Sequence, residues 1–76
     1  MNNQRRGKLE KVLSEIDKLS EKFQEILDEE QEYVDNIPEN LQNSERYITA
    51  EENCEQLDEC ISLLYEIMEI VNEVIG

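Results

Sequence analysis

The sequence predicts an all-α protein, an antiparallel two-helix hairpin that resembles a coiled coil. Apolar residues recur at alternating steps of three and four in two stretches of the chain, and the average step of 3.5 residues keeps a side-chain stripe facing a partner helix. Between the stretches lies a short segment that contains the only proline, Pro38. Six of the seven cations fall in residues 1–22 and the rest of the chain is acidic, so an antiparallel arrangement sets the basic start beside the acidic finish.

The first helix is expected over residues 8–35. Its interior has no glycine or proline and is rich in Glu, Lys and Leu, which favour helices. Residues 1–7 are polar and end at Gly7, so they are expected to form a flexible tail before a single domain of residues 8–76. The stripe predicted to face the second helix consists of Leu9, Val12, Ile16, Leu19, Phe23, Ile26, Glu30, Tyr33 and Ile37, widened on one flank by Leu13, Leu27 and Val34.

The connector is expected over residues 36–44. Pro38 disfavours helical geometry at Ile37, and the three asparagines of this segment tolerate turn conformations. Ser44 is a good N-cap residue, because its hydroxyl oxygen can accept a hydrogen bond from a backbone N–H of the first helical turn. The sequence therefore predicts that the chain reverses direction here and re-enters a helix after Ser44.

The second helix is expected over residues 45–75. Thr49 and Glu52 form a capping-box pattern that offers a later start. The earlier start is favoured, because the apolar stripe already runs through the first turns. That stripe consists of Tyr47, Ala50, Cys54, Leu57, Ile61, Leu64, Met68, Val71 and Ile75.

Size and apolar content predict self-association into a dimer or a higher helical bundle. A chain of 76 residues is near the lower limit at which one core stabilises a fold, and two helices side by side cannot bury all of its apolar side chains. The C-terminal half of the second helix is apolar well beyond one stripe, so a second interface is expected there. The oligomer interface is predicted to consist of Ile61, Leu63, Leu64, Ile67, Met68, Ile70, Val71 and Val74.

The net charge of −13 argues against direct binding of nucleic acid or anionic lipid and favours a basic partner. No apolar stretch has the length of a membrane span, and the N-terminus has no hydrophobic signal region. Cys54 and Cys60 are too far apart on one helix for a disulfide and are interpreted as reduced core residues. A cytoplasmic protein is expected.

An enzyme is not expected. The chain has no histidine, which removes the usual nucleophile–base pairs and the histidine ligands of di-iron bundles. Two cysteines are too few for a zinc site, and no calcium-binding loop is present. No cofactor and no metal are predicted.

Two polar residues stand out against this background. Glu30 occupies a stripe position, where it either reaches water or Arg46 near the loop, or else fixes the register of the helices or contacts a ligand. Arg46 is the only cation after Lys22 and lies in the first turn of a helix, where the dipole disfavours positive charge. It either bridges nearby carboxylates or, with Ser44, Tyr47 and free backbone N–H groups, forms an anion site. The carboxylates considered for the bridge are Glu30, Asp35, Glu39 and Glu45.

Acidic residues cover the outer faces of both predicted helices. They are either plain solvated surface or a mimic of a nucleic-acid backbone that offers carboxylates to a basic groove of a host protein. Asp58 and Glu59 are the candidate partner contacts on the second helix. The acidic residues of these two outer faces are Glu25, Asp28, Glu29, Glu32, Glu51, Glu52, Glu55, Asp58 and Glu59.

The stretch from Asp28 to Tyr47 contains Asp-Asn-Ile-Pro-Glu-Asn-Leu-Gln-Asn-Ser-Glu-Arg. It resembles a segment shared by short uncharacterised helical-hairpin proteins of phages and Gram-positive bacteria, where Gly often stands at the position of Asn40. The resemblance implies a mobile-element accessory protein that interferes with a host process. It implies no activity for particular residues.

Three functional hypotheses follow. The first is a non-enzymatic, acidic, oligomeric protein that binds and inhibits a host protein, such as a component of host defence. The second is a sponge that binds a small anionic or nucleotide ligand at the start of the second helix. The third is an architectural subunit that binds only its own kind.

Overall fold

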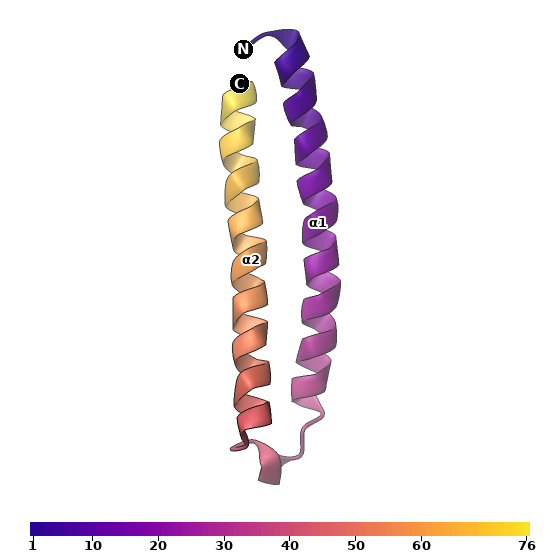
Figure 1. Cartoon of the computed structure of the whole chain (residues 1–76), viewed down its shortest axis with the longest axis vertical. Coiled ribbons are helices and arrows are strands. Elements are labelled where there is room, and N and C mark those ends of the chain that lie inside the picture. Colours follow the sequence, from indigo (N-terminus) through magenta and orange to yellow (C-terminus); the bar gives the residue numbers. More distant parts are fainter.

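The computed structural model describes all 76 residues as two long helices joined by a short connector (Figure 1). Helix α1 spans Asn3–Asp35, a single 3-10 turn, η1, spans Glu39–Leu41, and helix α2 spans Glu45–Ile75. The helices lie side by side and antiparallel, so both chain ends are at one end of the rod. The prediction of an all-α antiparallel hairpin is confirmed.

Helix α1 begins at Asn3, five residues before the expected start at residue 8. Asn2 is its N-cap, and the Asn2 side-chain oxygen accepts a hydrogen bond from the backbone N–H of Arg5 at 2.8 Å. The Arg6 guanidinium Nε donates to the backbone carbonyl of Ile75 at 3.1 Å, which ties this turn to the end of α2. Gly7 therefore does not break the helix, and residues 3–7, expected to be a flexible tail, form its first turns.

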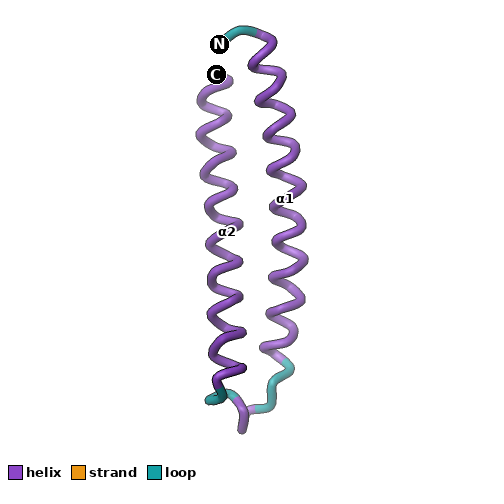
Figure 2. Tube along the Cα trace, viewed as in Figure 1, coloured by secondary structure: helices purple, strands orange, loops and turns teal.

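The connector follows the predicted bounds of residues 36–44, and Figure 2 shows it as loop on either side of the short helical turn η1. Its 3-10 turn closes through a hydrogen bond from the Leu41 N–H to the Pro38 carbonyl at 2.9 Å. Ser44 caps α2, because its hydroxyl oxygen accepts from the Tyr47 N–H at 3.2 Å. The choice of Ser44 over a later start at Thr49 is confirmed.

Five residues are buried, and all lie where α1 faces α2: Ser20, Val34, Ala50, Cys54 and Ile61. Val34, Ala50 and Cys54 form one cluster near the connector, against which Leu27 and Tyr47 pack. The Ser20 hydroxyl is satisfied within its own helix, since it donates to the Asp17 carbonyl at 2.7 Å. Every position of the predicted α2 stripe is at least partly buried, so that stripe is confirmed.

The predicted α1 stripe is only half right. Leu9, Ile16, Phe23, Glu30 and Ile37 are partly buried as expected, but the other four members are exposed. The exposed members are Val12, Leu19, Ile26 and Tyr33, and the positions that replace them between the helices are Leu13, Ser20, Leu27 and Val34. Small side chains explain the difference: α2 presents Ala50 and Cys54 to Val34, a site too tight for the ring of Tyr33.

The rod is long and thin, with extents of 59 × 15 × 12 Å. Its radius of gyration is 17.4 Å, against about 11 Å for a compact domain of 76 residues. Its accessible surface is 5987 Å², against roughly 4,900 Å² for a folded monomer of 9.0 kDa. A single hairpin thus leaves far more surface in water than a folded chain of this size does.

Candidate functional site

Depressions between α1 and α2 lie on both sides of the plane that contains the two helix axes. On one side, Tyr33 of α1 and Asn53 of α2 line a common depression. Cys60 lines a second depression on that same side, together with Glu30, Asn53 and Gln56. Residues seven apart lie on the same face of such a helix, so these residues identify the stripes that border this groove.

An apolar face follows from those stripes. Stepping back by seven from Tyr33 gives Ile26, Leu19 and Val12, and stepping forward from Gln56 and Cys60 reaches the apolar residues at the end of α2. We call the following eight residues the apolar face: Val12, Leu19, Ile26 and Tyr33 of α1, with Leu63, Ile67, Ile70 and Val74 of α2. Each is at least 38 % exposed, and Ile70 is 59 % exposed. Eight of the ten exposed large apolar side chains of α1 and α2 therefore lie on one side, and the exceptions are Ile48 and Tyr65.

The predicted oligomer interface divides into two sets. Leu63, Ile67, Ile70 and Val74 belong to the apolar face and are free to contact another molecule. The remaining four point toward α1: Ile61 is buried, and Leu64, Met68 and Val71 are partly buried. The α1 half of the face was missed, although a seven-residue repeat from Val12 to Tyr33 is visible in the sequence, because that repeat was assigned to the hairpin interior.

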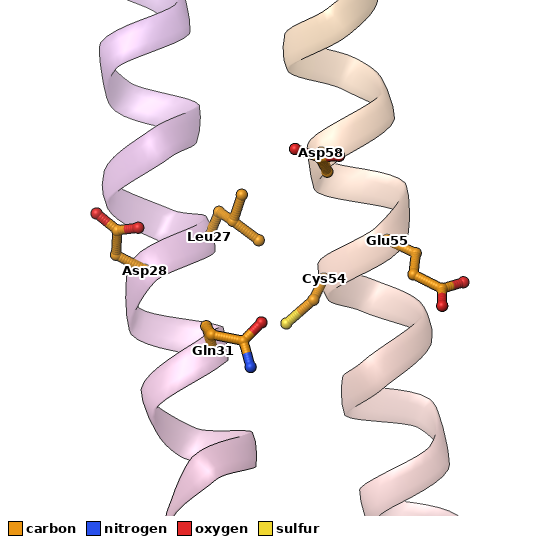
Figure 3. Close-up of a pocket in the computed structure, with 6 residues that line it drawn as sticks. All are labelled: Leu27, Asp28, Gln31, Cys54, Glu55 and Asp58. Atoms are coloured by element: carbon orange, nitrogen blue, oxygen red, sulfur yellow. The ribbon is translucent and has the colours of Figure 1, made fainter.

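The depression on the opposite side is acidic, and Figure 3 shows it in the half of the rod next to the connector. Leu27 of α1 and Cys54 of α2 point toward each other at its floor, whereas Asp28 and Glu55 point outward from their helices. The complete lining is Leu27, Asp28, Gln31, Cys54, Glu55 and Asp58. Asp58 thus lies beside other carboxylates, and Glu59 is exposed on α2 next to it. We call this surface the acidic groove.

The residues of the proposed anion site lie at the connector end of the molecule. Arg46 shares a depression with Glu30, Tyr33 and Glu45. Ser44 and Tyr47 are joined by the capping hydrogen bond, so one free N–H of this helix start is already occupied. Two carboxylates beside one guanidinium give the depression a negative balance, which disfavours an anionic ligand. Asp58 and Glu59 lie elsewhere, toward the acidic groove.

Cys54 and Tyr47 titrate at higher pH than free side chains. Burial raises the pKa of the Cys54 thiol above its ordinary value of 9.0, and the negative charges of Glu30, Asp35 and Glu51 raise it further. Partial burial also raises the pKa of Tyr47, and Glu51 and Asp35 contribute. Both cysteines are free thiols. A thiol kept protonated in this way is a weak nucleophile, consistent with a packing role for Cys54.

No set of three or more His, Cys, Asp and Glu side chains is placed to hold a metal ion. Neither helix combines the length and the apolar content that crossing a bilayer requires. No family model matches the chain, and neither a curated protein nor a solved structure matches it.

Proposed function

We propose that this protein acts by binding other protein surfaces, without chemistry, as a helical hairpin that assembles with a second copy of itself. The observation that carries the proposal is the apolar face, which gathers eight exposed apolar side chains on one side of the rod. An exposed apolar patch of this kind marks an interaction surface or leads to aggregation. A partner that covers the face removes this liability.

The exposed area supports a partner of the chain's own size. The hairpin has about 1,100 Å² more accessible surface than a folded monomer of its mass, whereas a standard interface buries roughly 800 Å² on each partner. Burying the apolar face against another hairpin gives a four-helix bundle, in which each helix has two neighbours instead of one. The bundle is thus the smallest assembly that covers the face.

The assembly is tested by Ile70→Asp, with Tyr65→Asp as the matched control. Both residues are exposed on α2, but Ile70 belongs to the apolar face, whereas Tyr65 lies seven residues after Asp58, along the acidic groove. Light scattering should find twice the mass of 9.0 kDa for the native chain and Tyr65→Asp, and one chain for Ile70→Asp. A native chain that is monomeric and helical at micromolar concentration would overturn the proposal.

The acidic groove supports a second contact, with a host protein that has a basic surface. Thirteen of the twenty acidic residues lie in residues 23–61, where the only cation is Arg46. The resemblance of the connector segment to phage proteins gives this contact a context, a mobile-element protein that occupies a host component in the cytoplasm. Carboxylates along a rod present charge at regular spacing to a basic cleft, as a nucleic-acid backbone does.

The host contact is tested by reversing Asp58 and Glu59 together to Lys. The control reverses Glu10 and Glu69, which changes the net charge equally but lies nearer the chain ends. On immobilised protein, the host complex should weaken as salt rises and be lost with the first pair only. A complex that neither salt nor the Asp58 and Glu59 reversal affects would contradict this contact and leave assembly as the function.

A further inference from the structure

The charge along the rod differs between its two halves. The connector half, residues 23–61, has one cation and thirteen anions, whereas the half next to the chain ends has six cations and seven anions. Two rods that lie with their connectors at the same end bring the two strongly negative halves together. Two rods in opposite directions place each negative half beside a nearly neutral one, so this direction minimises repulsion.

The border of the apolar face on α1 carries a second charge pattern. Glu29 lines a depression with Ile26 and Tyr33 of the face, and Lys8 lines one with Arg5 and Leu9 near the chain ends. Lys8, Glu15, Lys22 and Glu29 follow one another at intervals of seven residues, so they lie on one face of α1, and all four side chains are exposed. The signs along this border therefore alternate: Lys8, Glu15, Lys22, Glu29.

An alternating border of this kind is complementary to itself when reversed. In an isologous dimer, two α1 helices that cross the interface in opposite directions pair residue i with j and residue j with i. With Leu19 near the twofold axis, Lys8 meets the partner's Glu29 and Glu15 meets the partner's Lys22. The same axis places Val12 against the partner's Ile26. One register therefore packs the apolar residues of the two α1 helices together and also pairs their opposite charges.

Resting on the assembly proposed above, we infer that two hairpins join their apolar faces in opposite directions, with the connector end of each over the chain ends of the other. Each α1 packs along the partner's α1, and each α2 along the partner's α2. The weakly packed end of one chain, where no residue beyond Ile61 in α2 is buried, is covered by the firmly packed end of its partner. The occupant of the apolar face is thus a reversed second copy.

Disulfide trapping tests the direction. Leu19→Cys in a Cys54→Ala, Cys60→Ala background should form a covalent dimer on mild oxidation, because the two copies of residue 19 lie near the axis. Gln24→Cys is the control and should not, since Gln24 is hydrogen-bonded to Asp28 on the side of the acidic groove.

The alternative direction, with both connectors at one end, sets α1 against the partner's α2. It predicts that Leu19→Cys chains cross-link only when mixed with Leu63→Cys chains, and that result would overturn the inference. A dimer by light scattering that gives no Leu19 cross-link also overturns the direction but leaves the assembly intact. A monomeric native chain overturns both.

Charge exchange tests the pairing independently. Glu15→Lys makes the protein less negative, so general repulsion alone predicts tighter association, whereas pairing with the partner's Lys22 predicts about tenfold weaker association. Adding Lys22→Glu should restore the native affinity. Glu21→Lys, the same charge change on an exposed residue outside the border, should not weaken the dimer. Equal effects of Glu15→Lys and Glu21→Lys would contradict the pairing.

Discussion

Next to the connector, Val34, Ala50 and Cys54 are buried between the helices, whereas next to the chain ends no residue before Ser20 or after Ile61 is buried. The first region has small side chains on α2 that let the helices approach closely. The second has large aliphatic side chains on α2, and several of them point to solvent, Ile70 most of all. One end of the hairpin is therefore stabilised by buried side chains between its helices, whereas the other leaves large apolar side chains exposed.

The two regions should respond very differently to the same substitution, made as Val34→Ala in one and as Val74→Ala in the other. Val34 is 6 % exposed and Val74 is 49 % exposed. Val34→Ala should lower the free energy of unfolding by about 2 kcal/mol at any protein concentration, because two buried methyl groups are lost and a cavity remains. Val74→Ala should cost under about 0.5 kcal/mol in a dilute monomer.

Urea denaturation over a range of protein concentrations measures both costs. The cost of Val74→Ala should grow as the concentration rises, because its side chain is buried only in the assembly. The cost of Val34→Ala should stay constant. Equal costs at low concentration would show that the two ends are packed alike in the isolated chain.

A smaller effect on stability is expected at alkaline pH, and it comes from Cys54 in the region next to the connector. The Cys54 thiol has a raised pKa in the folded state, so the unfolded chain ionises first once the pH passes the ordinary value of 9.0. The unfolded state then holds fewer protons than the folded state, and stability falls as the pH rises; below that value this contribution is fully present. Urea midpoints at neutral and alkaline pH should differ more in the native chain than in Cys54→Ala.

The two free thiols of the chain, Cys54 and Cys60, should differ in reactivity. Cys60 is partly exposed and lies toward the apolar face, whereas Cys54 is buried among carboxylates. An alkylating reagent should therefore modify Cys60 well before Cys54 in the folded protein. Equal rates would indicate that the connector end opens readily, against the tight packing of Val34, Ala50 and Cys54.

The hairpin was predictable because its signals are local. Pro38 and the asparagines mark the reversal, Ser44 marks the start of α2, and a period of 3.5 residues marks both stripes. The rotation of α1 was not predictable in the same way, because its apolar surface is wider than one interface and both flanks repeat every seven residues. Packing decided it, through the fit of Val34 against Ala50 and Cys54, and a single sequence does not encode that fit as a pattern.

The start of α1 was missed for a related reason. Gly7 and the polar residues around it suggest a break, but the cap on Asn2 and the bond from Arg6 to Ile75 stabilise the first turns. Of the candidate site, the α2 half of the apolar face was visible as surplus apolar residues. The α1 half of the apolar face was not predictable, because it depended on which apolar flank of α1 faces α2. The position of the acidic groove depends on the same rotation of α1.

Both chain ends lie at one tip of a rod 59 Å long (Figure 1). In a reversed pair, the tips that carry the ends are a full rod length apart. A tandem fusion of two copies therefore needs a linker of about 17 extended residues or more to reach from one C-terminus to the next N-terminus. A shorter linker holds the two tips together and forces the copies into the direction that their charges oppose.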